Sequence, residues 1–208
     1  MKKILVALGF TMAAMSAQAS ILSLAPAGPV TFSTATLACP NCGHDVIAGA
    51  TGGLFGQLSA NFDTSFQATF LGSEAGDINF YVANGTNVMS NKTTAIGDTF
   101  SFDVSAGLVN FGFHDQTTGV GASNLTDYLN KIAYISNDNG DGGFKYFDAS
   151  GNPFAFLIGF NDSGSLDGDY DDYVVGVNAV PVPAALPLMA SALGMFGVAR
   201  RKSKAKAA

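Results

Sequence analysis

Apolar and polar residues alternate with a period of two along much of the chain, in short stretches. Phe62, Phe66 and Phe70, for example, fall on one face of an extended segment. Turn-forming residues separate these stretches, as at Asn84-Gly85. The pattern predicts strands at residues 62–71, 77–83, 99–104, 108–113, 132–136, 144–147, 154–160 and 173–177.

Short strands separated by such turns predict an all-β fold, an antiparallel β-sandwich or jelly roll. Good helix formers are scarce, and only residues 123–130 could form a helical turn. The 17 phenylalanines supply enough apolar surface for a core. Residues 20–179 are therefore expected to form a single domain, flanked by two targeting segments.

The first 19 residues read as a secretory signal peptide. Lys2 and Lys3 are followed by an apolar run to Met15, and Ala17 and Ala19 form a small-residue cleavage site. A retained N-terminal anchor is the alternative, which the cleavage site disfavours. The pattern predicts export through the inner membrane of a bacterium.

Residues 180–208 form a second targeting segment. A Val-Pro-x-Pro opening precedes an uncharged apolar run at 184–199, and five basic residues follow the run. Such a run can enter a bilayer as a helix, with the cations kept on the cytoplasmic side. The segment is either a permanent anchor or a temporary one.

Charge is distributed very unevenly once both ends are set aside. The chain has 16 acidic and 10 basic residues, but residues 20–179 hold all 16 acids and only three lysines, so their net charge is 3 − 16 = −13. Fifteen of the acids are Asp, and the other is Glu74. This charge excludes nucleic acid as a partner and favours cations.

The densest acidic stretch, residues 161–173, reads NDSGSLDGDYDDY. Clustered carboxylates repel one another unless a cation binds, and hard oxygen ligands suit Ca²⁺. The stretch is not an EF-hand, because Asp172 and Asn178 stand where that loop needs Gly and Glu. A solvated turn is the alternative to a Ca²⁺ site. The acidic turn at residues 137–141 could likewise be a metal site or a solvated loop. The predicted Ca²⁺ ligands are Asp162, Asp167, Asp169, Asp171 and Asp172.

Cys39 and Cys42 form a C-x-x-C pair, followed by His44. An exported chain favours a local disulfide between them. A zinc site that uses His44 and a redox pair are the alternatives, but no second cysteine pair is present and the context is all-β. No nucleophile motif accompanies His114-Asp115, so no catalytic residue is predicted and the protein is expected not to be an enzyme.

The terminal segment resembles the PEP-CTERM protein-sorting signal, in its Val-Pro-Leu-Pro-Ala variant. The resemblance is carried by both ends of the segment, at Val180, Pro181, Pro183, Ala184, Arg200 and Arg201. It implies a Gram-negative bacterium in which an exosortase recognises and cleaves the segment. It also implies a cell-surface or extracellular location, after transient anchoring in the inner membrane, and an association with exopolysaccharide and biofilm.

The body is similar to a domain of unknown function that occurs in such exported proteins and is suspected of binding Ca²⁺. Residues 66–80 (FQATFLGSEAGDINF) and 156–175 (FLIGFNDSGSLDGDYDDYVV) carry this similarity. We therefore expect a non-enzymatic surface or matrix protein that binds Ca²⁺. The alternatives are a secreted hydrolase and a carbohydrate-binding module that uses Tyr81, Tyr128 or Tyr134.

Overall fold

A computed structural model describes residues 21–32, 46–47, 50, 52–137, 143–162, 168 and 170–180. Several predicted features lie outside these residues: the signal peptide with Ala17 and Ala19, the pair Cys39 and Cys42, the acidic residues Asp167 and Asp169, and the sorting residues Pro181, Pro183, Ala184, Arg200 and Arg201. Within the described ranges, no helix has the length and apolar character that crossing a membrane requires.

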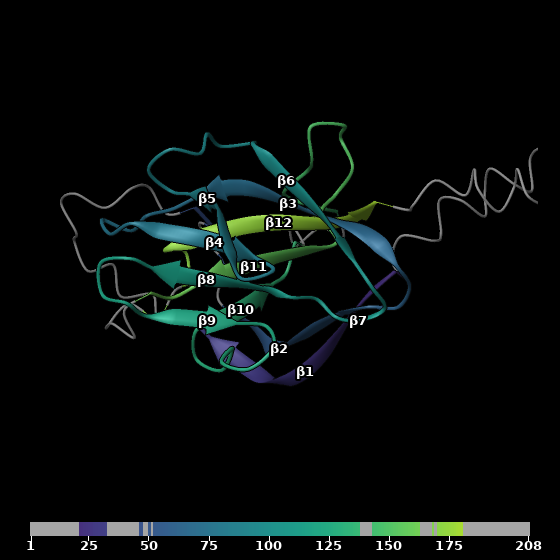
Figure 1. Cartoon of the computed structure of the whole chain (residues 1–208), viewed down its shortest axis with the longest axis horizontal. Coiled ribbons are helices and arrows are strands. Elements are labelled where there is room, and N and C mark those ends of the chain that lie inside the picture. Colours follow the sequence, from purple (N-terminus) through teal and green to yellow (C-terminus); the bar gives the residue numbers. More distant parts are fainter. Residues whose placement is uncertain are drawn as a thin grey trace, which may run out of the picture.

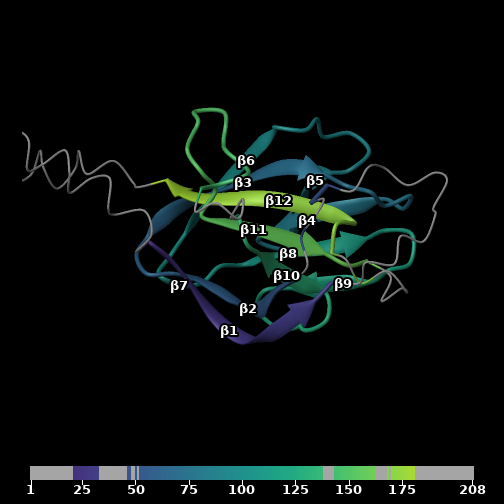
Figure 2. The same ribbon diagram turned by 180° about the vertical axis from the view of Figure 1, so that it is seen from behind.

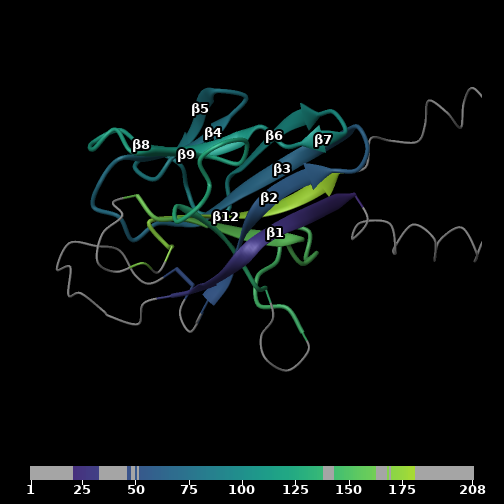
Figure 3. The same ribbon diagram turned by 90° about the horizontal axis from the view of Figure 1, so that it is seen from below.

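Two antiparallel sheets pack face to face, as Figures 1 and 3 show. The larger sheet has the order β1-β2-β10-β11-β12-β3-β6, with β7 paired to β2. Its strands are β1 (Leu22–Thr31), β2 (Gly52–Ala60), β3 (Thr64–Gly72), β6 (Thr99–Val104), β7 (Gly107–Leu108), β10 (Ile132–Ile135), β11 (Phe156–Phe160) and β12 (Tyr173–Val180). The smaller sheet has the order β5-β4-β8-β9, formed by β4 (Asn79–Ala83), β5 (Thr86–Ser90), β8 (Phe111–Asp115) and β9 (Gly121–Ser123).

The predicted antiparallel β-sandwich is confirmed. Seven of the eight predicted strands form, with small shifts at their ends, and residues 108–113 are divided between β7 and β8. Residues 144–147 form isolated bridges instead of a strand, and the bridge of Phe147 is to Pro153. Residues 124–131 form turns rather than a helix.

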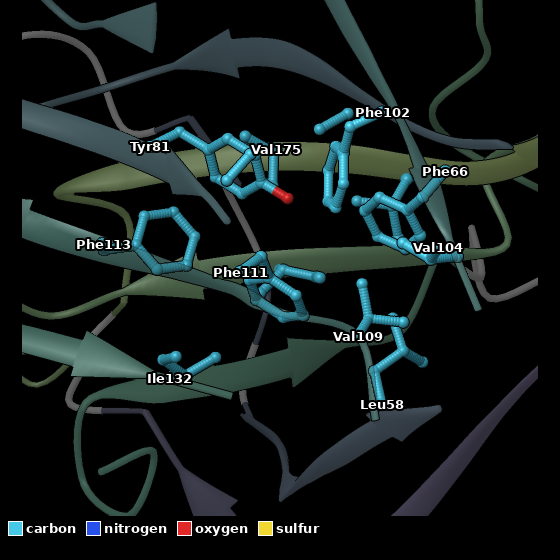
Figure 4. Close-up of a cluster of buried hydrophobic side chains, with 14 of the residues drawn as sticks. Leu58, Phe66, Tyr81, Phe102, Val104, Val109, Phe111, Phe113, Ile132 and Val175 are labelled. Carbon is cyan, nitrogen blue, oxygen red and sulfur yellow. The ribbon is translucent and has the colours of Figure 1, made fainter. Parts of the chain in front are cut away.

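The main core lies between the two sheets and is largely aromatic (Figure 4). Alternate side chains of β8 point into it, and Phe111 and Phe113 are almost fully buried. Phe111 stacks on Phe66 of the larger sheet, with ring centroids 6.1 Å apart. Phe113 stacks on Phe160 at 5.1 Å, so the aromatic contacts join the two sheets.

A smaller apolar cluster covers the other face of the larger sheet. It contains Phe154, Leu157 and Val174. A Cβ added to Gly176 of β12 would lie 2.5 Å from the Phe154 ring, so only glycine allows this ring to pack on the strand. Because β11 and β12 are covered on both faces, their sequences are continuously apolar instead of alternating.

Asn124 joins the sheets through hydrogen bonds inside the core. Its side chain is fully buried, and its Oδ1 accepts from the Leu58 amide and from the Tyr134 hydroxyl, both at 2.8 Å. Its Nδ2 donates to the carbonyls of Leu58 and Val109, at 2.9 and 2.8 Å. A fully satisfied buried amide of this kind fixes how β9 sits over β2.

The described chain enters and leaves the sandwich at the same end. Leu22 at the start of β1 pairs with Ala60, and Val180 at the end of β12 pairs with Ser65 across the β2–β3 turn. Val180, the first residue of the predicted sorting segment, is thus the last residue of a central strand (Figure 2). The ends of β3, β8 and β11 lie at the opposite end, where the acidic residues gather.

Candidate metal centre

Three aspartates from distant parts of the chain converge at the end of the sandwich opposite Val180. Asp77 lies between β3 and β4, Asp115 ends β8, and Asp162 follows β11. One carboxylate oxygen of each lies within 4.8 Å of the others. Asp115 and Asp162 are buried and Asp77 is half-buried, so this group, called the aspartate cluster below, could hold a metal ion.

The pairing of β8 with β4 and a tight turn fix the position of Asp115. Its backbone lies opposite Asn79 in the register, and its carboxylate accepts from the amide of Thr117 at 2.7 Å. The amide and hydroxyl of Thr118 also donate to this carboxylate. These bonds hold the fully buried carboxylate in place, and it makes no salt bridge with a cationic side chain of the described residues.

Asn79 supplies an oxygen beside the cluster. Its side chain is fully buried, and its Nδ2 donates to Asp162 Oδ2 at 2.7 Å. Its Oδ1 accepts no hydrogen bond from the described residues. Buried polar atoms are nearly always satisfied, so this amide oxygen, on the group that contacts Asp162, is a candidate fourth ligand.

Asp77 is carried by the segment 72–77, which two residues that follow β5, Asn91 and Lys92, hold in place. Asn91 Nδ2 donates to the Asp77 carbonyl at 2.8 Å and to Ser73 Oγ at 3.1 Å, and its Oδ1 accepts from the Asn79 amide at 2.9 Å. Lys92 Nζ donates to the carbonyls at positions 75 and 76. Asn91 therefore positions both Asp77 and Asn79.

The same segment is tied to the start of β12. Ser73 Oγ donates to the Asp172 carbonyl, and the Glu74 amide donates to the Asp171 carbonyl at 3.1 Å. The described parts of residues 66–80 and 156–175 thus lie side by side. Together they supply two of the three cluster carboxylates, Asp77 and Asp162.

The electrostatics of the cluster disfavour three charged carboxylates without a cation. Burial raises the pKa of Asp162, the hydrogen bond from Asn79 opposes that rise, and the negative charges of Asp115 and Asp77 add to it. A cation bound between the three groups would remove this penalty.

The residues predicted as ligands are only partly brought together. Asp162 belongs to the aspartate cluster. Asp172 Oδ2 instead accepts from the Asp162 amide at 2.8 Å, and Asp171 Oδ2 accepts from the Val46 amide at 3.1 Å. The Asp172 carboxylate thus holds the backbone of Asp162, whereas the Asp171 carboxylate holds the backbone at Val46.

Asp77 and Asp115 were not predicted as ligands. Each lies next to a predicted strand, Asp77 at the start of residues 77–83 and Asp115 two residues after 108–113. Their position at the ends of predicted strands is the sequence feature that could have identified them as ligands. Only the pairing of the strands, however, shows which strand ends lie close together.

The tyrosines suggested for a carbohydrate-binding surface do not form one. Tyr81 and Tyr134 lie in the core between the sheets, and Tyr128 is only half-buried against it. The expectation was wrong for the first two, because each alternates onto the inner face of its strand.

No protein-family model matches the chain, and no similarity to a curated protein or to a solved structure was found.

Proposed function

We propose that the protein is an exported, non-enzymatic surface or matrix protein whose β-sandwich binds Ca²⁺ at the aspartate cluster. The observation that carries the cation site is the convergence of Asp77, Asp115 and Asp162 next to buried Asn79, whose Nδ2 contacts Asp162 and whose Oδ1 is unsatisfied. Four oxygens from three segments would supply part of the roughly six to eight that Ca²⁺ takes, and the cation would neutralise carboxylates that otherwise repel one another.

The chemistry of these ligands favours Ca²⁺ over transition metals. Every side-chain atom that the cluster offers is an oxygen, whereas Zn²⁺ and Cu²⁺ sites in proteins use imidazole and thiolate. Two oxygens bound to one Ca²⁺ at about 2.4 Å can be at most about 4.8 Å apart, a limit that the cluster meets. Ca²⁺ also tolerates the irregular geometry of ligands that come from unrelated segments.

The site would also stabilise the fold, because its ligands belong to both sheets. Asp77 and Asp115 adjoin β4 and β8 of the smaller sheet, and Asp162 follows β11 of the larger one. A cation bound by all three would link the sheets at this end, as the core aromatic contacts link them further along. Binding free energy would then appear as stability against unfolding.

The export and sorting parts of the proposal are supported by the two targeting segments. The signal peptide directs the chain through the inner membrane, and an exosortase removes the segment after the body. The acidic body then remains at the cell surface or in the extracellular matrix with exopolysaccharide, where bound Ca²⁺ offers coordination positions to polysaccharide oxygens. Half-buried Asp77 leaves one side of the cluster accessible for such contacts.

Calorimetric titration of the purified full-length chain with Ca²⁺ tests the cation site. We expect binding heat at a stoichiometry near one, and no such heat for Asp162→Asn. Absence of heat with the wild-type chain would contradict the site.

The mass of the protein from wild-type and exosortase-deficient cells tests sorting. We expect a C-terminal truncation only when the exosortase is present. An intact C-terminus in wild-type cells would show a permanent anchor instead.

A further inference from the structure

The outer face of the smaller sheet contains an open groove of about 370 Å³. Phe111, Phe113 and Ala122 point from β8 and β9 into the core, so Gly112 and Gly121, which alternate with them, face outward. The groove extends across this glycine floor, from the β4–β5 hairpin to the turn after β9. Its volume lies at the lower end of the range of about 300–1,000 Å³ that is typical of ligand pockets.

The two floor glycines lack the side chains that would normally stand on the outer face of a sheet. A Cβ added to Gly121 would meet its nearest atom, the Phe113 carbonyl oxygen, at 3.5 Å, an ordinary contact. A side chain would thus fit at Gly121 and occupy the groove. At Gly112 an added Cβ would lie 2.3 Å from the Ala122 carbonyl oxygen, so that glycine is required by the sheet itself.

The rim of the groove offers neutral hydrogen-bonding groups. These groups belong to Asn110, Ser123 and Thr126. Its one carboxylate, Asp127, is bound to Lys131 Nζ at 2.7 Å, which neutralises it. The Asp127–Lys131 pair therefore adds no net charge at the groove, in a body whose net charge is −13.

We propose that this groove binds a strand of neutral polysaccharide. The glycine floor accepts the flat, apolar face of a sugar ring, and the rim amide and hydroxyl groups pair with its hydroxyls. An acidic polysaccharide would be repelled by the body, and the Lys131 ammonium at the groove is already paired with Asp127 and bonded to the Gly121 carbonyl. This proposal rests on the matrix function proposed above and specifies its partner, a neutral polysaccharide. The groove binds the sugar directly and not through the Ca²⁺ ion.

The groove and the aspartate cluster are adjacent. His114, on the groove, precedes Asp115 of the cluster in β8, and the cross-strand partners of these two residues are Phe80 and Asn79 in β4. One short sheet would thus present a sugar-binding face and a cation site at its end, so two contacts with the same matrix become possible.

Gly121→Leu fills the groove and tests the proposal. Its matched control is Gly28→Leu on the edge strand β1, where an added Cβ meets no atom within 4 Å. Thr126→Arg, at an exposed position on the rim, blocks the groove without touching the sheet and serves if Gly121→Leu does not fold. The full-length chains are titrated by calorimetry in a detergent without a sugar headgroup. The probes are neutral hexasaccharides of glucose, mannose and galactose, with a hexauronate for comparison.

We expect at least one neutral hexasaccharide to bind the wild-type chain. Both groove variants should weaken it at least tenfold, and Gly28→Leu should not. Binding of the hexauronate alone, binding of no probe, or unchanged binding by Thr126→Arg would overturn the proposal. Binding should also persist in a chelator and in Asp162→Asn. Loss of sugar binding in chelator or in Asp162→Asn would mean that the sugar binds through the cation, and it would overturn the groove proposal. If sugar binds but Ca²⁺ gives no binding heat, only the proposed cation site is overturned.

Discussion

Replacing Asp162 by Asn is expected to reverse the order of stability between variant and wild type when Ca²⁺ is added. Without a cation, carboxylate oxygens no more than 4.8 Å apart repel by about 3 kcal/mol or more per charged pair, at an effective dielectric constant of about 20. Proton uptake by Asp162 relieves part of this repulsion, and the weaker hydrogen bond to Asn79 costs the variant about 1 kcal/mol. We therefore expect the metal-free variant to be more stable by about 1 kcal/mol, or about 2–4 °C in Tm.

Calcium should favour the wild type instead. At a free Ca²⁺ concentration of about 100 times Kd, a single site stabilises the folded state by about 2.7 kcal/mol, which corresponds to roughly 5–10 °C for a domain of this size. The variant lacks one of the three carboxylates and should gain little. The two unfolding curves should thus exchange order between chelator and Ca²⁺.

Thermal unfolding monitored by circular dichroism measures both states. Asp103→Asn is the matched control, because it removes the same charge from an exposed position of β6. It should follow the wild type in both buffers. If Asp162→Asn is less stable than the wild type in chelator, the carboxylates do not repel as argued. If it keeps the full Ca²⁺ shift, Asp162 is not a ligand.

Three further predictions concern the cluster and the core. Because the pKa of Asp162 is raised in the folded state, the metal-free protein should lose stability as pH rises from the ordinary aspartate value through that pKa. The rise in Tm caused by Ca²⁺ should grow as pH increases over the same range, because protons compete with the cation for the carboxylates. Melting curves at several pH values, in chelator and in Ca²⁺, measure both pH dependences. Asn91→Ala should weaken Ca²⁺ binding about tenfold in calorimetry by releasing Asp77, whereas Lys92→Ala, which loses two exposed bonds, should change it less. Asn124→Leu should lower the free energy of unfolding in urea by about 4 kcal/mol, because it leaves buried partners unsatisfied; a loss below about 1 kcal/mol would mean that the amide does not join the sheets.

Strands whose apolar residues alternate, or whose turns are strong, could be predicted from the sequence. The pair β1 and β2 could not, although it has the longest ladder of the sandwich. Proline and glycine in residues 22–31 argue against a strand, but an edge position and a bulge between Pro26 and Gly28 accommodate them. Glycines in β2 read as loop, yet a Cβ on Gly53 would lie 2.4 Å from the Tyr134 carbonyl oxygen. These glycines are therefore required by the close approach of a neighbouring strand, which depends on the tertiary structure and cannot be read from the local sequence.

The candidate site shows the same limit of sequence reasoning. The density of Asp in residues 161–173 pointed to the stretch from which Asp162 joins the aspartate cluster. Density along the chain could not reveal Asp77 and Asp115, which are 85 and 47 residues away in sequence (162 − 77 and 162 − 115). They meet Asp162 only because β8 pairs with β4 and the two sheets pack at that end.

The positions of Val180 and the aspartate cluster at opposite ends of the sandwich have a mechanical consequence. A load applied between a tether at Val180 and a partner at the cluster would act along β12, which is hydrogen-bonded to β11 on one side and β3 on the other. Force in that direction shears both ladders, so many hydrogen bonds must break together instead of one after another. The domain is thus oriented to resist pulling, as a link under tension between a cell and its surroundings would require.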